Sequence, residues 1–189
     1  MARDWSMAAA VGLAAFAVPQ IVVAAEYMSV EQAQKSLFPQ ADRFNEIILA
    51  LSPAQKQQVA ALAGPQPPHR SLRSWKALKG AELLGYVFVD EVVGRQDFIT
   101  YATAIDASGR LGTLEVLAYR ESHGSEVRGD AWRRQFVGRS SLDQLHFESD
   151  IKNIAGATLS CGHVTEGVRW LVALWEVSLR SGGNASPAA

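Results

Sequence analysis

The pattern of apolar and polar positions predicts two helices in the first half of the chain. In residues 29–39 the apolar side chains recur at helical spacing, Ser29 stands three residues before a glutamine as in a capping box, and a proline closes the segment. Residues 52–64 repeat this arrangement, with Ser52 as N-cap, proline in the first turn and glycine just past the end. The proline-rich stretch 64–70 then predicts an extended surface connector.

The pattern changes to that of strands in the middle of the chain. Residues 83–94 and 98–106 are rich in β-branched and aromatic side chains, and residues 111–121 alternate between apolar and polar. The turn-forming sequence Asp-Ala-Ser-Gly at 106–109 separates the last two segments. We therefore expect a β-hairpin over residues 97–119.

Helical spacing returns towards the end of the chain. Residues 129–138 predict a short helix bounded by two glycines, and we expect Ser160 to be the N-cap of a long helix that begins near Cys161, with Thr158 just outside its first turn. Strands grouped between helices predict an α+β fold, with a twisted, mainly antiparallel sheet packed against helices. The apolar stripe of the last helix consists of Val164, Val168, Leu171, Val172 and Trp175.

Composition places the chain among ordinary globular proteins. It has 189 residues, 48% hydrophobic and 20% charged, with a formal net charge of −1. This length accommodates one domain with a sizeable core, and the near-neutral charge argues against nucleic acid as a partner. Cys161 is the only cysteine, so no internal disulfide can form, and we expect its thiol to be buried.

The two ends of the chain differ from its middle. Residues 7–17 are almost wholly apolar, Pro19 interrupts them and small residues follow, which predicts a secretory signal peptide over residues 1–25. A retained membrane anchor is the alternative, because an apolar run of this length is close to that of a membrane span. Both imply a periplasmic or other extracytoplasmic location, membrane-associated in the second case. Residues 181–189 are polar and predict a flexible tail.

Small residues and a threonine, Ala155-Gly156-Ala157-Thr158, come directly before the last helix. Small residues let another molecule approach the backbone closely, and a helix start offers unpaired N–H groups that favour an anion such as phosphate. On spacing alone, an ordinary tight turn that Gly156 relieves and Thr158 caps explains the pattern at least as well.

These residues resemble the Ser/Thr-Gly-Ala-Thr motif of the FMN-binding domain family, which occurs in the sodium-pumping NADH:quinone reductase, in Rnf complexes and in small exported proteins. Two further segments are similar to the family's Glu-x-x-Gly turn and Phe-x-Gly segment: Glu121-Ser122-His123-Gly124 and Phe136-Val137-Gly138. The resemblance implies a domain core at residues 83–180. Residues 26–82, which contain the two predicted helices and the proline-rich connector, form a helical N-terminal part before it.

The resemblance also implies a cofactor and a function. FMN would be joined to the Thr158 hydroxyl through a phosphoester, installed outside the cytoplasm by a FAD:protein FMN transferase. The protein would then be an exported electron carrier between membrane-bound or periplasmic redox partners rather than a stand-alone enzyme. For the carboxylate of the Glu-x-x-Gly turn, a solvated loop position is an equal expectation. The other residues that the resemblance places around FMN are Gly156, Ala157, Leu159, Ser160, Glu121, Ser122 and Gly124.

Two positions depart from the family pattern. Lys152 and Ala155 stand where the family usually has aspartate and serine or threonine. If the transferase reads the aspartate, we expect attachment to be slow or to need a matched transferase; alternatively, Lys152 pairs with the phosphate as a point charge. The departures also leave open non-covalent FMN, or a cofactor-free periplasmic binding or sensory domain of the same fold.

The remaining candidate residues indicate no further site. Cys161, His163 and Glu166 have the chemistry of metal ligands but lack a second ligand pair at a diagnostic spacing, so we expect the last two on the helix surface. Four arginines at 128, 133, 134 and 139 predict a solvated face or a docking surface for an acidic redox partner. We expect Trp132, Trp170 and Trp175 in the core.

Overall fold

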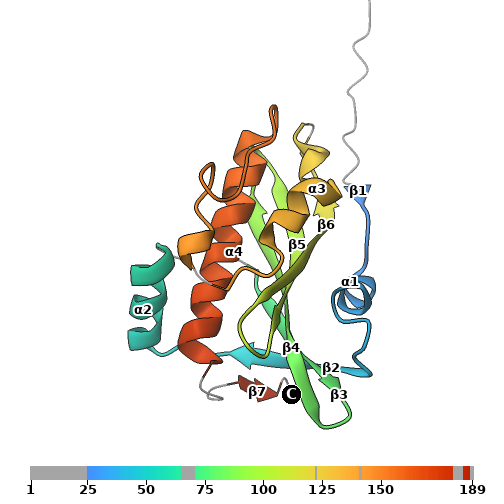
Figure 1. Ribbon diagram of the computed structural model, residues 1–189, viewed down its shortest axis with the longest axis vertical. Helices are drawn as coiled ribbons and strands as arrows, with labels where there is room; N and C mark the ends of the chain where they lie inside the picture. The colour runs from blue at the N-terminus through green and yellow to red at the C-terminus, as the bar shows by residue number, and fades with distance from the viewer. Residues whose placement is uncertain (1–24, 65–70, 122, 141, 181–184, 188–189) are drawn as a thin grey trace, which may run out of the picture.

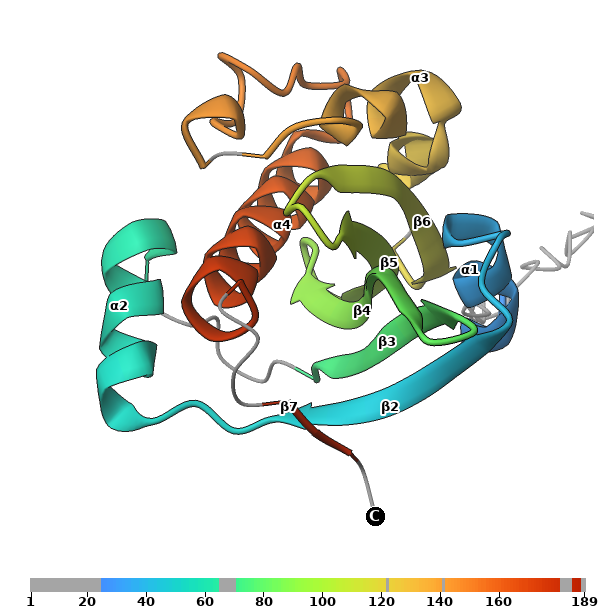
Figure 2. The same ribbon diagram turned by 60° about the horizontal axis from the view of Figure 1, so that its bottom comes forward.

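The computed structural model describes residues 25–64, 71–121, 123–140, 142–180 and 185–187. Its centre is an antiparallel seven-stranded sheet in the order β1-β6-β5-β4-β3-β2-β7. The sheet is strongly twisted, with α4 across one face and α1 against the other (Figures 1 and 2). The fold is therefore α+β, as the sequence predicts.

The elements fall into a main sheet, its short edges and the helices. The five long strands are β2 (Arg43–Leu49), β3 (Arg73–Lys79), β4 (Glu82–Val93), β5 (Phe98–Asp106) and β6 (Leu111–Tyr119). The short edge strands are β1 (Ala25–Glu26) and β7 (Ala185–Pro187). The helices are α1 (Val30–Leu37), α2 (Pro53–Ala63), α3 (Asp130–Arg133) and α4 (Thr158–Ser178), with 3₁₀ turns η1 (Ser125–Arg128), η2 (Arg134–Phe136) and η3 (Leu142–Gln144).

The local expectations for helices and hairpin are confirmed. Both α1 and α2 begin with a complete capping box, at Ser29 and Ser52. Strands β5 and β6 pair as an antiparallel hairpin. Its turn is closed by the Asp106 carboxylate, which accepts hydrogen bonds from the N–H groups of Ser108 and Arg110. Helix α3 and η2 together occupy the short helical segment predicted at 129–138.

Strands β2 and β3 lie within residues 26–82, where the sequence predicts a helical part and a connector but no strands. They pair with each other from Arg43↔Leu78 to Ile47↔Ser74, and β3 joins β4, so this part of the chain completes the same sheet. Neither strand has a long alternating pattern of its own, and their stability comes from neighbours that are distant in sequence. Residues 65–70, most of the predicted connector, lie outside the described residues.

The structure tests the prediction for the C-terminal end of the chain but not the one for the N-terminal end. Residues 1–24, almost all of the predicted signal peptide, lie outside the described residues. Within the predicted tail, Ala185–Pro187 pair with β2 as β7, so at these three residues the expectation of a flexible tail is wrong. Among the helices that the structure describes, none is long and apolar enough to cross a membrane.

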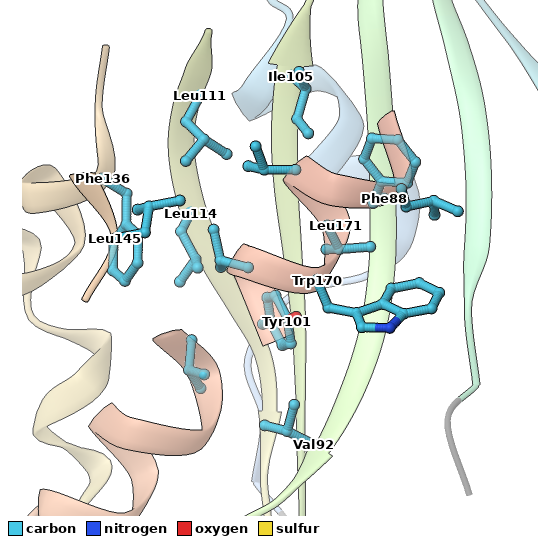
Figure 3. Close-up of a cluster of buried hydrophobic side chains, with 14 of the residues drawn as sticks. Phe88, Val92, Tyr101, Ile105, Leu111, Leu114, Phe136, Leu145, Trp170 and Leu171 are labelled. Carbon is cyan, nitrogen blue, oxygen red and sulfur yellow. The ribbon is translucent and has the colours of Figure 1, made fainter. Parts of the chain in front are cut away.

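The main core lies between α4 and strands β4 to β6. Figure 3 shows Leu171 of α4 close to side chains from these strands, including Phe88, Tyr101 and Leu114, all fully buried. The predicted stripe of α4 and the three tryptophans expected in the core are buried, as is the Cys161 thiol. A smaller cluster around Trp75 fills the opposite face beneath α1.

A polar contact beneath α4 determines how closely this helix approaches the sheet. Asp90 is fully buried and accepts a hydrogen bond of 2.7 Å from the Tyr101 hydroxyl. Gly167 of α4 lies directly over that hydroxyl, and a Cβ atom there would come within 2.4 Å of it. The absence of a side chain at Gly167 therefore lets α4 pack closely on β5, which in turn places the start of the helix.

Candidate functional site at the start of α4

A cavity of about 390 Å³ opens at the start of α4. Three segments form its walls: the turn between β4 and β5, the turn after β6, and the start of α4 itself. Figure 1 places the first turn of α4 at the same end of the molecule as the ends of these strands. The volume falls within the range of small-molecule sites. The lining residues are Arg95, Gln96, Glu121, His123, Gly156, Ala157, Thr158, Leu159 and Ser160.

The start of α4 differs from the prediction. Thr158 is the first helical residue rather than a residue just outside the helix, and the N-cap is Ala157, without a side-chain hydrogen bond. Ser160 is not the N-cap: it lies in the first turn, with its hydroxyl 2.8 Å from that of Tyr119. A helix without a side-chain cap leaves its first N–H groups available to solvent or to a ligand. The 21-residue α4 is such a helix, and its first residues line the cavity.

Backbone and side chains at this helix start leave room for a ligand. Gly156 has a φ of +87°, a backbone conformation that favours glycine. A Cβ atom at this position would meet no atom within 4 Å, so the space beside the backbone is open. Thr158 is exposed, and its Oγ1 accepts a hydrogen bond of 2.8 Å from Nδ2 of Asn153. Leu159 is 49% exposed and offers an apolar surface.

Glu121 ties two walls of the cavity together. Its Oε1 accepts hydrogen bonds from the N–H groups of Gln96 at 2.6 Å and Asp97 at 2.9 Å. Partial burial acts to raise the pKa of Glu121, but these backbone donors and the charge of Arg95 outweigh it, so the pKa lies below its usual value. Glu121 is thus not a purely solvated carboxylate: through Oε1 it holds the β4–β5 turn against the turn after β6.

Tyr119 ties the turn after β6 to the first turn of α4. Its hydroxyl donates to the carbonyl oxygen of His123 and also contacts the Ser160 hydroxyl. Gly124, at a φ of +90°, packs against this contact, and a Cβ atom there would come within 2.6 Å of the Tyr119 oxygen and 2.9 Å of the Ser160 oxygen. Burial raises the pKa of Tyr119, which keeps its phenol protonated and able to donate.

Lys152 does not line this cavity. Its ammonium group donates instead to the carbonyl oxygens of Glu148 and Ser149, at 3.2 Å and 2.9 Å. Ser122 lies outside the described residues. The structure therefore brings the predicted residues from Gly156 to Ser160 together with Glu121, places Gly124 behind them, and leaves Lys152 outside.

The predicted arginine cluster is largely engaged within the fold. Arg133 pairs with Glu115 and Asp130, and Arg139 donates to backbone carbonyl oxygens. Arg128 stacks on the Tyr27 ring, with 3.3 Å between the guanidinium carbon and the ring centroid. The guanidinium groups of Arg133 and Arg139 therefore hold the loops after β6 together, whereas Arg134 is 73% exposed.

The sequence predictions missed four residues of the site: Arg95, Gln96, His123 and Asn153. Arg95 supplies a positive charge to the wall formed by the β4–β5 turn. The glycine before Arg95 is the sequence feature that marks this turn. In the structure, a Cβ atom at Gly94 would come within 2.5 Å of the Glu121 carboxylate, so the turn needs a glycine there. His123 belongs to the predicted Glu-x-x-Gly turn, but Asn153 has no sequence signal beyond its proximity to Thr158.

The residues with metal-ligand chemistry do not converge. The Nδ1 atom of His163 lies 2.6 Å from the carbonyl oxygen of Val93, and Glu166 is exposed. Within the described parts of the chain, no three His, Cys, Asp or Glu side chains are grouped so that they could hold a metal ion.

Comparison with known proteins indicates which ligand suits the cavity. Residues 94–173 match the family model of the FMN-binding domain, a range that runs from the β4–β5 turn into α4 and includes all three walls. Over these residues the chain is similar to the FMN-binding domain family. The predicted resemblance is thus confirmed, and the ligand that the family implies is FMN. No curated protein matches the chain.

The residues of the cavity fit FMN. Gly156 leaves open space next to the backbone, the uncapped helix start offers N–H groups to a phosphate, and Leu159 offers apolar contact to a flavin ring. Arg95 adds a positive charge close to an anionic ligand. The cavity at the start of α4 therefore carries groups suited to each part of this cofactor.

Proposed function

We propose that this protein is an exported flavoprotein that holds FMN covalently, through a phosphoester on Thr158, and transfers electrons between redox partners. The observation that carries the proposal is the position of the Thr158 hydroxyl. It is exposed at the uncapped start of α4, and it lines the cavity of an FMN-binding domain. The apolar run near the N-terminus supports export.

Electrostatics supports attachment at this end of α4. A phosphodiester carries one negative charge, and a helix N-terminus stabilises such a charge by about 0.3–1 kcal/mol. Arg95, which lines the same cavity, adds to the attraction. These contributions orient a phosphate but are too small to retain a cofactor against dilution. A covalent bond removes that limit, which suits a protein outside the compartment where FMN is made.

The carboxylate in the cavity favours a carrier over an enzyme. When bound, FMN supplies reversible one- and two-electron chemistry, and the protein supplies attachment, orientation and electrostatics. A general base works best with a pKa near the working pH and an open lone pair. The carboxylate of Glu121 has a lowered pKa, and its Oε1 accepts hydrogen bonds from two backbone N–H groups. It therefore supports the loop rather than a proton transfer.

Mass spectrometry after co-expression with a FAD:protein FMN transferase tests the attachment. We expect one FMN-phosphoryl adduct on the wild-type protein, none on Thr158→Ala, and an adduct on Thr158→Ser, which keeps the hydroxyl. A fluorescent band in a denaturing gel should follow the same order. In this reaction the Thr158 oxygen bonds to the FMN phosphorus of FAD, the diphosphate bond breaks and AMP leaves with its bridging oxygen.

Other outcomes would contradict the proposal in distinct ways. A wild-type protein at its bare polypeptide mass would exclude covalent attachment under these conditions. A yellow colour that is lost on denaturation would indicate FMN held without a covalent bond. A colourless protein would favour the alternative function, a cofactor-free binding or sensory domain of the same fold.

A further inference from the structure

We propose that Asn153 prepares the Thr158 hydroxyl for attachment of FMN by donating a hydrogen bond to its oxygen. This inference rests on the proposed function and adds a second residue at the reacting atom. The Nδ2 atom of Asn153 lies 2.8 Å from Oγ1 of Thr158. Both side chains are at the surface of the site, within reach of an incoming dinucleotide.

The direction of this hydrogen bond determines what the hydroxyl can do. An amide nitrogen donates and does not accept, so the Thr158 oxygen must be the acceptor. The hydroxyl hydrogen is then not used in the contact, and the second lone pair of the oxygen remains available. Among the described residues, the structure records no other hydrogen bond to this oxygen. Asn153 therefore holds Oγ1 in place while leaving both its proton and a lone pair free to react.

The attachment reaction makes use of such a donor. The Thr158 oxygen forms a bond to the FMN phosphorus of FAD, the bond from that phosphorus to the bridging oxygen breaks, and AMP leaves while the hydroxyl proton passes to a base. As the proton leaves, negative charge develops on the Thr158 oxygen. A donor already directed at this oxygen stabilises that charge without reorganisation.

The backbone on both sides of Asn153 is held in place. At Lys152, the N–H donates to the Gln135 side chain at 2.7 Å, and the carbonyl accepts from the Trp132 indole at 2.9 Å. On the other side, the N–H of Ala157 donates to the carbonyl of Ile154 at 3.0 Å. Because the loop is anchored on both sides, the Asn153 amide is directed towards the start of α4.

The neighbouring side chains do not provide this contact. The Lys152 ammonium is bound to two carbonyl oxygens of its own loop, and Ala155 has no polar side-chain atom. Of these three neighbouring residues, only Asn153 has a side chain that reaches Thr158.

Rates of FMN attachment test the inference. Purified wild-type protein, Asn153→Ala and Asn153→Asp are each incubated with the transferase and FAD, and mass spectrometry follows the adduct with time. Loss of one hydrogen bond predicts attachment about 3- to 10-fold slower in Asn153→Ala. Asn153→Asp should be slower still, because a carboxylate of the same shape cannot donate and repels the phosphate. The same two substitutions at Asn45, an exposed residue of β2, serve as matched controls and should leave the rate unchanged.

The results separate this inference from the proposed function. If the wild-type protein gains an adduct and Asn153→Ala or Asn153→Asp gains it equally fast, the role of Asn153 is wrong and the attachment site stands. If the wild-type protein gains none, both proposals fail. Circular dichroism of each variant shows whether it is folded, and we expect wild-type spectra because Asn153 is exposed.

Discussion

The helices of this protein begin in two different ways. Helices α1 and α2 have a serine N-cap and a reciprocal glutamine at the third position, so their own side chains bond the first N–H groups. Helix α4, the longest described helix, has alanine at its N-cap and no side-chain cap. The start of α4, at Thr158, lines the cavity, whereas the starts of α1 and α2 do not.

The difference follows from what stabilises each helix. Helix α2 buries only Val59, so it depends on local capping, whereas fourteen residues of α4 are buried. Burial of apolar side chains contributes more to stability than a cap does. A helix held by its packing can leave its first N–H groups open, and these groups are what a phosphate needs. The following predictions test this comparison.

Removing a core contact of α4 should have the largest effect. Leu171 is fully buried, so Leu171→Ala should lower the free energy of unfolding by about 2–5 kcal/mol, through lost burial and the cavity left behind. Leu62→Ala is the control on α2, where the side chain is 43% exposed, and should change stability by less than about 0.5 kcal/mol. Chemical denaturation measures both. Similar losses for the two variants would contradict the packing account.

Substituting the glycine before α4 should cause an intermediate loss of stability and should also slow FMN attachment. Gly156→Ala forces alanine into a left-handed conformation at a φ of +87°, which should cost about 1–2 kcal/mol without a steric clash. Gly138→Ala is a matched control, because Gly138 has a φ of +81° and equally open surroundings. Both variants should lose similar stability, but only Gly156→Ala should slow FMN attachment, since its methyl group enters the cavity. Equal attachment rates would mean that the open space at Gly156 is not used.

Removing a cap from α2 should have the smallest effect. Ser52→Ala removes the acceptor for the N–H group of Gln55 and should lower stability by about 1 kcal/mol, with faster amide exchange confined to α2. Ser52→Thr keeps a hydroxyl acceptor and should retain most of the stability. FMN attachment should be the same in all three proteins. A change in attachment after loss of this cap would mean that α2 influences the start of α4.

Local patterns predicted much of the fold. The capped helices, the 97–119 hairpin and the stripe of α4 were each visible within a dozen or so residues, where spacing and turn chemistry determine structure. Strands β2 and β3 were not, because each is stabilised mainly by a partner distant in sequence, such as Leu78 for Arg43. The start of α4 was misplaced because Ser160 resembles an N-cap, while its hydroxyl instead contacts Tyr119, 41 residues earlier.

The sequence by itself determined the local chemistry of this protein: a hydroxyl that follows a run of small residues at a helix start, and the similarity of residues 94–173 to the FMN-binding domain family. The tertiary structure decided what surrounds that hydroxyl. It brings Arg95 into the lining of the same cavity, directs Asn153 at Thr158 and leaves Lys152 outside. The physical reason is one of range: caps and periodicity act over a few residues along the chain. The walls of the cavity meet only because α4 packs on the sheet and the Glu121 carboxylate bonds a turn 25 residues away.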